Sequence, residues 1–217
     1  MNNEKLNSIR CAVCETAKKM FHSGLVAGTW GNISTRADGD SMVVTPSGMP
    51  YDMLQPEDMV LVNMHDLSYE GNLKPSIETP MHARLLLGRR EVNAVIHTHS
   101  TYALMMAAAH RPIPPICDDQ VQILGGGIRV ARYTLPGTDD MADAVFEAIS
   151  DRMGALVANH GAVVMGRTLE EAFIAANVLE KAAQVFIGTQ AVGGPVELSL
   201  EDIAYMNNFF LYKYGQR

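Results

Sequence analysis

Two histidines separated by one residue, His97 and His99, follow the apolar run 92–96. On an extended strand, residues i and i+2 point to the same side, so both imidazoles can reach one point. A third histidine, His160, closes another apolar run, 155–158, and precedes a glycine. Three neutral imidazoles with one open position are typical of a catalytic divalent metal site. The pattern therefore predicts a metal ion acting as a Lewis acid.

A simpler interpretation of the pair is two ordinary strand residues without a ligand. The other four histidines have no comparable partners along the chain, and they are His22, His65, His82 and His110. If a helix begins at Thr79, His82 lies one turn after the acid Glu78, where it could orient a neighbouring group. The more ordinary expectation for His82 is that it is packed or solvated.

Two glycine-rich turns are candidate anion-binding segments. Glycine lets backbone N–H groups approach an anion closely, and hydroxyl or amide side chains add donors. The first turn contains Gly31 and Asn32, the second contains Ser47 and Gly48, and Ser76 lies just before Glu78. Such turns are common in sheet proteins, so neither alone indicates anion binding. The interpretation depends on both turns occurring together with the predicted metal site.

The remaining pattern predicts alternating helices and strands. Thr79 is expected to cap a helix with Pro80 as its first residue, and Thr168 with Glu171 forms a capping-box pattern before a long apolar helix. Helices are expected at about 6–23, 79–87, near 105, 137–150, from 168 and from 199, and strands after 28 and at 42–44, 59–62, 92–97, 128–131, 155–158 and 162–165. Strands and helices do not alternate strictly. We therefore expect an α/β fold with three α/β/α layers, a mainly antiparallel central sheet and a single domain over residues 1–217.

Composition restricts the partners and the compartment. The formal charge of −7 over 217 residues argues against a nucleic-acid surface. No apolar run approaches the ~18 residues of a membrane span, and no signal peptide is expected, so a cytoplasmic location is predicted. Cys11 and Cys14 form a Cys-X-X-Cys motif. Because both fall within the first amphipathic helix with no strand before them, we interpret them as small packed residues and not as a redox pair.

Five segments, in this order and spacing, resemble the class II aldolase/adducin head family over essentially the whole chain. The most specific are His97-Thr98-His99 and Asn159-His160-Gly161; the others are residues 28–34, 45–48 and 75–79. The resemblance implies a homotetramer with active sites at subunit interfaces. It also implies zinc, or another divalent ion such as manganese or cobalt, bound to His97, His99 and His160.

The resemblance also assigns roles around the predicted ion. Glu78 would be the acid/base residue and would ligate the metal while the site is empty. The family's phosphate-binding positions are occupied here by Gly31, Asn32, Ser47, Gly48, Ser76 and Ile77. Ile77 departs from the hydroxyl residue usual in the family's fuculose-phosphate aldolases. Asp119 stands near the position of a tyrosine in those enzymes, so Asp119 or a tail tyrosine, Tyr212 or Tyr214, would be the second acid/base group.

The function implied is reversible aldol cleavage of a ketose 1-phosphate to dihydroxyacetone phosphate and an aldehyde. The same chemistry in this family also serves a sugar-phosphate 4-epimerase, a decarboxylase of a 3-oxo sugar-acid phosphate, or a dehydratase. Glu78 favours aldol cleavage, because the family's epimerases usually carry aspartate there. A non-catalytic adducin-like interaction module would be expected to lack the three histidines, and a zinc hydrolase would have no need of the phosphate-like turns.

Overall fold

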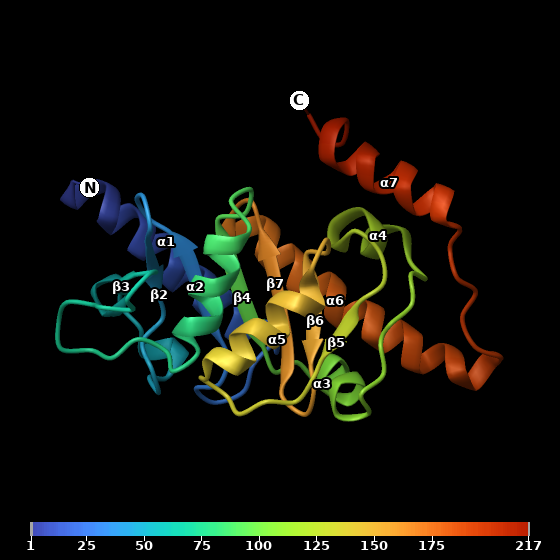
Figure 1. Ribbon diagram of the computed structural model, residues 1–217, viewed down its shortest axis with the longest axis horizontal. Helices are drawn as coiled ribbons and strands as arrows, with labels where there is room; N and C mark the ends of the chain where they lie inside the picture. Colours follow the sequence, from blue (N-terminus) through green and yellow to red (C-terminus); the bar gives the residue numbers. More distant parts are fainter. Residues whose placement is uncertain (1, 217) are drawn as a thin grey trace.

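A seven-stranded mixed sheet forms the centre of the computed structural model, which describes residues 2–216 (Figure 1). The strand order is β3-β2-β1-β4-β7-β6-β5, and every neighbouring pair is antiparallel except β5 with β6. The strands are β1 (Asn32–Arg36), β2 (Ser41–Val44), β3 (Val60–Asn63), β4 (Ala94–Thr98), β5 (Arg129–Ala131), β6 (Gly154–Val157) and β7 (Gly161–Gly166). The expectation of a mainly antiparallel sheet in an α/β fold is confirmed.

Helices cover both faces of this sheet (Figure 1). α2 and α5 pack on one face, and α1, α3 and α6 pack on the other. The helices are α1 (Asn3–His22), α2 (Thr79–Gly88), α3 (Thr101–Ala108), α4 (Asp118–Leu124), α5 (Asp139–Ile149), α6 (Leu169–Thr189) and α7 (Leu200–Tyr212), with short 3-10 turns at Tyr51–Met53, Pro56–Asp58 and Gln190–Val192. The three-layer arrangement predicted from the sequence is therefore present.

The strand sequences build two separate cores because successive side chains point to opposite faces. In β4, Ala94 and Ile96 contribute to the core under α1, α3 and α6, whereas Val95 contributes to the core under α2 and α5. His97 has the same parity as Val95. The strand therefore directs His97 to the α2/α5 face of the sheet.

The strand register brings polar residues of β1 and β4 together beside the start of β7. Asn32 of β1 lies directly opposite His97 of β4, and Val163 of β7 flanks His97 on the other side. Thr98 lies opposite Ala162, so the turn before β7 ends beside the His-X-His segment. Long-range antiparallel pairing thus assembles the site near the middle of the sheet.

Three local expectations need correction. α2 begins at Thr79, but its N-cap is Glu78 and Pro80 is the second helical residue. The Glu78 side chain makes no capping hydrogen bond, so its carboxylate is available elsewhere. At α6, Thr168 accepts from the N–H of Glu171 as predicted, but the Glu171 carboxylate accepts from the N–H of Arg167 instead of completing the box.

The third correction concerns α4 (Asp118–Leu124), a helix that is absent from those expected from the sequence. The predicted apolar helix near residue 105 is confirmed as α3, although Met105 is exposed and the buried side chains are Ala103, Met106 and Ala107. Cys11 and Cys14 lie within α1, as predicted.

The last helix, α7, lies at one end of the molecule against α4 and has no buried residue (Figure 1). Among the described residues, no helix is both long and apolar enough to cross a membrane.

Candidate active site

Three imidazole rings converge at the predicted metal site. The ring centroids of His97, His99 and His160 are 4.7, 4.8 and 4.9 Å apart in pairs. One potential ligand nitrogen from each lies within 4.8 Å of the others. β4 supplies His97, the residues just after β4 supply His99, and the tight turn between β6 and β7 supplies His160. The sequence prediction that these three histidines meet is confirmed.

Glu78 completes the cluster from the N-terminus of α2. Its Oε2 is 3.3 Å from Nε2 of His97, and its Oε1 is 3.1 Å from Nε2 of His160. Burial acts to raise the pKa of Glu78, but His97, His160 and the donor Asn32 outweigh it and hold the pKa well below its ordinary range. Glu78 is therefore ionised at neutral pH.

The donor set fits a divalent cation. The Nδ1 of His97 lies 3.0 Å from the carbonyl oxygen of Ala162, so Nδ1–H donates and the Nε2 lone pair faces the cluster. Burial lowers the pKa of His97, and burial with the neighbouring His97 lowers the pKa of His99 to about 3. Both rings are therefore neutral at pH 7, which is the form that ligates metals. Neutral imidazole nitrogens and one carboxylate are typical ligands of zinc and related ions.

Behind Glu78, a chain of buried hydrogen bonds joins β1 to α2. Asn32 Nδ2 donates to Glu78 Oε2 at 2.7 Å. His82 Nε2 lies 2.6 Å from Asn32 Oδ1, and Ser34 Oγ lies 2.7 Å from His82 Nδ1. His82 and Ser34 are both 0% exposed. His82 is thus packed, as expected, but it is also linked to the acid one turn before it, and Ser34 was not identified from the sequence.

The expected anion-binding residues surround one cavity of about 450 Å³. Its lining includes Glu78, His99 and His160 together with all six positions assigned to the phosphate, namely Gly31, Asn32, Ser47, Gly48, Ser76 and Ile77. Thr29, Trp30, Pro46 and Pro136 complete the wall, and these four were not predicted. Asn32 Oδ1 bonds to His82, and one hydrogen of its amide group bonds to Glu78. The second amide hydrogen is therefore available to a ligand.

Two glycines allow the backbone to approach the histidines. Gly31 has φ +81°, and a Cβ there would lie 2.8 Å from the carbonyl oxygen of His97. A Cβ on Gly161 would lie 2.2 Å from the carbonyl oxygen of Thr98. Only glycine therefore lets β1 and β7 lie this close to the end of β4.

Gly161→Ala is expected to destabilise the protein by about 1–3 kcal/mol, because the added methyl group must push β7 away from β4. The free energy of unfolding measured in urea tests this. Gly188→Ala is the matched control, since a Cβ at Gly188 in α6 meets nothing within 4 Å. Equal stability of the Gly161→Ala variant and the wild type would contradict the close approach.

A carboxylate from α6 fixes the segment after His99. Glu180 accepts from the N–H groups of Tyr102 and Ala103 at 2.9 and 2.8 Å. The N–H groups of the first turn of a helix have no partner within the helix, and Ser100 makes no side-chain cap at α3, so Glu180 supplies the missing acceptor. Because α3 begins two residues after His99, this contact holds the His-X-His segment in place.

Comparisons with known proteins decide the family. Residues 11–187 match the family model described as Class II Aldolase and Adducin N-terminal domain. The chain belongs to this family. The 5-deoxy-D-ribulose 1-phosphate aldolase of Bacillus thuringiensis serovar kurstaki is 36% identical over 201 residues, which are 92% of this chain and 93% of that protein. An L-fuculose phosphate aldolase of Escherichia coli O6:H1 is 33% identical over 212 residues, 97% of each chain.

Solved structures agree with this class II aldolase/adducin assignment. A structure of an L-fuculose 1-phosphate aldolase superposes with a TM-score of 0.90 at 29% identity, over 94% of this chain and 97% of that chain. The resemblance inferred from the five sequence segments is thus confirmed as family membership.

The three residues that the family resemblance offered as the second acid/base group, Asp119, Tyr212 and Tyr214, lie elsewhere in a single chain. Asp119 is in α4, where it pairs with Lys181, and it lines a different cavity. Tyr212 is at the end of α7 and 73% exposed. None of these three residues lines the cavity that contains Glu78, so a role for any of them in this aldolase-family site requires a neighbouring copy of the chain.

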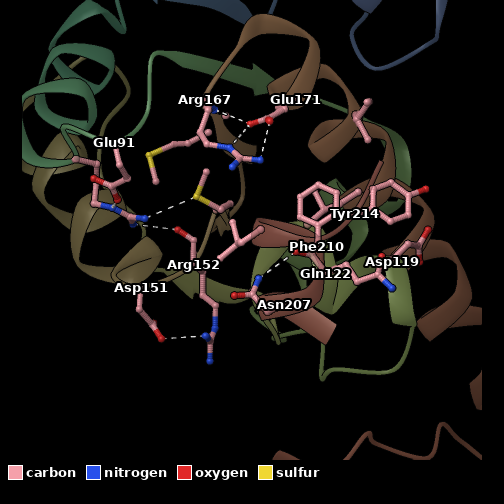
Figure 2. Close-up of a pocket in the computed structure, with 18 residues that line it drawn as sticks. Glu91, Asp119, Gln122, Asp151, Arg152, Arg167, Glu171, Asn207, Phe210 and Tyr214 are labelled. Atoms are coloured by element: carbon pink, nitrogen blue, oxygen red, sulfur yellow. Dashed lines mark hydrogen bonds and ion pairs between the residues drawn. The ribbon is translucent and has the colours of Figure 1, made fainter. Parts of the chain in front are cut away.

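The cavity lined by Asp119, about 460 Å³, lies between α7, α4 and the end of β7 (Figure 2). Its charged groups are largely paired: Arg167 with Glu171 at 2.8 Å and Arg152 with Asp151 at 2.9 Å. Figure 2 shows Phe210 and Tyr214 of the C-terminal segment on the opposite side from Asp151. No residue predicted to bind phosphate or metal belongs to this cavity.

Acid is expected to destabilise this class II aldolase/adducin fold through His82. Burial lowers the pKa of His82 from 6.5 to about 3, so only the unfolded chain protonates this ring between those pH values. The unfolded state then binds more protons, and the free energy of unfolding falls as the pH falls from about 6.5 towards 3. Urea unfolding with a chelator present, at several pH values, measures this slope.

His82→Gln should have a shallower slope than the wild type, because glutamine does not titrate in this range. Parallel slopes for His82→Gln and the wild type would refute the assignment to His82.

Proposed function

We propose that this chain is a divalent-metal-dependent aldolase that reversibly cleaves a ketose 1-phosphate to dihydroxyacetone phosphate and an aldehyde. One observation carries the proposal. An ionised carboxylate, Glu78, lies within 3.3 Å of two of three converging imidazoles, at a cavity whose wall includes all six candidate phosphate-binding residues. Relatives that are 36% and 33% identical are named as sugar-phosphate aldolases, which supports the same chemistry here.

In this proposal, His97, His99 and His160 hold the metal ion. The ion, with zinc as the first candidate, supplies positive charge that stabilises the negative charge developing on the substrate oxygens. The backbone and hydroxyl donors at Ser47, Gly48 and Ser76 bind the phosphate and so fix the position of the reacting bond. Ile77 presents an apolar side chain there, so its contribution is restricted to its backbone N–H.

Glu78 is the proton-transfer residue in this proposal. In the cleavage direction Glu78 must first take up a proton from solvent, and it delivers this proton to C3 of the dihydroxyacetone phosphate portion after the C3–C4 bond breaks, while the second acid/base group accepts the proton of the C4 hydroxyl. In the synthetic direction it removes that proton. Its buried position, 4% exposed, keeps bulk water from competing for the transfer.

The aldehyde oxygen needs a second acid/base group. We assign this role to Asp119 or a tail tyrosine, Tyr212 or Tyr214, supplied by a neighbouring copy in a homotetramer, because none of them reaches the cavity within its own chain. An active site at the subunit interface would then be completed only in the assembled protein.

The first substrate to test is 5-deoxyribulose 1-phosphate, followed by fuculose 1-phosphate, since relatives are named for these two compounds. The assay couples dihydroxyacetone phosphate to NADH oxidation. We expect metal-dependent release from at least one ketose 1-phosphate, with chelated protein as the control. A ketose 5-phosphate converted to its 4-epimer, or carbon dioxide released from a 3-oxo acid phosphate without any dihydroxyacetone phosphate, would replace aldol cleavage as the function. No reaction and no stoichiometric metal would favour an interaction module.

A further inference from the structure

The buried chain Ser34–His82–Asn32–Glu78 has a direction that the chemistry of its members fixes. An ionised carboxylate only accepts hydrogen bonds, so the Asn32 atom 2.7 Å from Glu78 Oε2 must be the NH₂ group. Asn32 Oδ1 therefore faces His82 and needs a donor, which places the proton of His82 on Nε2. A neutral ring then has a bare Nδ1, so the Ser34 hydroxyl donates to it.

The backbone aligns this chain. Asn32 and Ser34 are two residues apart on β1 and therefore point to the same face of the sheet. Glu78 and His82 are four residues apart at the start of α2 and lie on one side of the helix. Along the hydrogen-bonded chain, residues of β1 and residues of α2 alternate. Side-chain hydrogen bonds therefore join β1 to α2 at this point.

The two oxygens of Glu78 are consequently unequal. Oε2 accepts from Asn32 at the end of a chain in which every donor is already assigned. Oε1 is buried and lies 3.1 Å from Nε2 of His160, which would turn its lone pair to the metal ion, so no donor outside the histidine cluster is assigned to Oε1. A proton arriving at Oε2 would face the N–H of Asn32, whereas a proton arriving at Oε1 meets no such donor.

We propose that His82 is a positioning residue for the proposed aldolase reaction. Together with Ser34 and Asn32 it keeps Oε2 of Glu78 as a permanent acceptor and leaves Oε1 as the oxygen that exchanges the substrate proton. The His82 backbone N–H donates to the Glu78 carbonyl at 3.3 Å, as in any helical turn, but the His82 ring does not line the cavity, and its hydrogen bonds reach the Glu78 carboxylate only through Asn32. This inference rests on the proposed function for its catalytic consequence, but the direction of the hydrogen bonds can be tested without it.

The first test reads the protonation of His82 directly. Nitrogen-15 NMR of the zinc-loaded wild-type protein at pH 7, with His82 assigned by its loss in His82→Gln, distinguishes the three states of the ring. We expect a neutral imidazole with its proton on Nε2. A proton on Nδ1, or a doubly protonated ring, would overturn the proposal whatever reaction the protein catalyses.

The second test separates positioning from packing by kinetics. His82→Leu removes the donor to Asn32, and we expect kcat to fall by about 10–100-fold, the range typical of outer-shell partners, with KM and metal content nearly unchanged. His82→Gln places an amide N–H near the position of Nε2 and should recover most of kcat. His65→Leu, at an exposed histidine, is the control for the substitution.

The outcomes are distinguishable. Equal kcat values for His82→Leu and the wild type, or equal losses of kcat in the glutamine and leucine variants, would overturn the positioning role. If His82→Leu does not fold, Ser34→Ala is used in its place, because it removes the donor to Nδ1 while keeping the ring. Absence of aldolase activity in the wild type would refute the proposed function, and the NMR result would still decide the hydrogen-bond direction.

Discussion

Glu78→Gln is expected to lower kcat by about 10²–10⁴-fold, the range attributed to a general acid/base group. Glutamine has nearly the same shape as glutamate and can still lie beside Asn32, but it cannot take up and return a proton at neutral pH. The three imidazoles remain in place, so the metal content should stay close to that of the wild type. Turnover in the dihydroxyacetone phosphate assay and elemental analysis of the same sample test the two parts.

Glu70→Gln is the matched control, because Glu70 is an exposed glutamate outside the cavity. Wild-type turnover in Glu78→Gln would remove Glu78 from the proton transfer. Loss of the metal together with the activity would instead identify Glu78 mainly as a ligand.

His99→Ala is expected to abolish stoichiometric metal binding and turnover together. Removing a ligand should weaken binding by more than the 10–100-fold typical of an outer-shell change. His99 is the best ligand to remove because it is only partly buried, whereas His97 is 0% exposed and its loss would also leave a cavity in the core. Competition with a chromogenic chelator measures the affinity for zinc.

His22→Ala is the control for a histidine outside the site. Activity in His99→Ala that returns at high zinc concentration would agree with a weakened site. Full metal content and full activity in His99→Ala would refute the metal centre.

The residues that carry the chemistry of the site were easier to predict from the sequence than the strand pairings that bring them together. His97, His99, His160 and Glu78 carry ligand and acid groups whose spacing is visible along the chain, and the structure brings them together. Their convergence depends on Asn32 lying opposite His97 and on Thr98 lying opposite Ala162. These pairings join residues more than 60 positions apart, and no short-range pattern encodes them.

The roles of His82 and Ser34 depend on partners that are distant in the sequence. The spacing of four residues from Glu78 placed His82 near the acid, but the partner that gives it a role, Asn32, comes from another strand. A serine in the mostly polar strand β1 has no feature in the sequence that distinguishes it from its neighbours. Its importance follows from complete burial against a ring nitrogen that needs a donor.

The role of Asp119 cannot be deduced from a single copy of the chain. No helix was expected around it, because the seven residues of α4 give too little helical periodicity to recognise. The structure places Asp119 against Lys181 of α6, away from the phosphate-binding residues. Its predicted role, like that of Tyr212, depends on a second copy and stays a prediction.

The order of the strands in the sheet differs from their order of synthesis. β4 sits between β1 and β7, and the last imidazole, His160, is made some sixty residues after His99. A growing polypeptide on the ribosome therefore holds at most two of the three imidazoles until the hairpin of β6 and β7 has emerged. Binding of the ion by all three histidines must therefore follow the packing of this hairpin against β4. The metal-free and metal-bound forms can differ only late in synthesis of the chain.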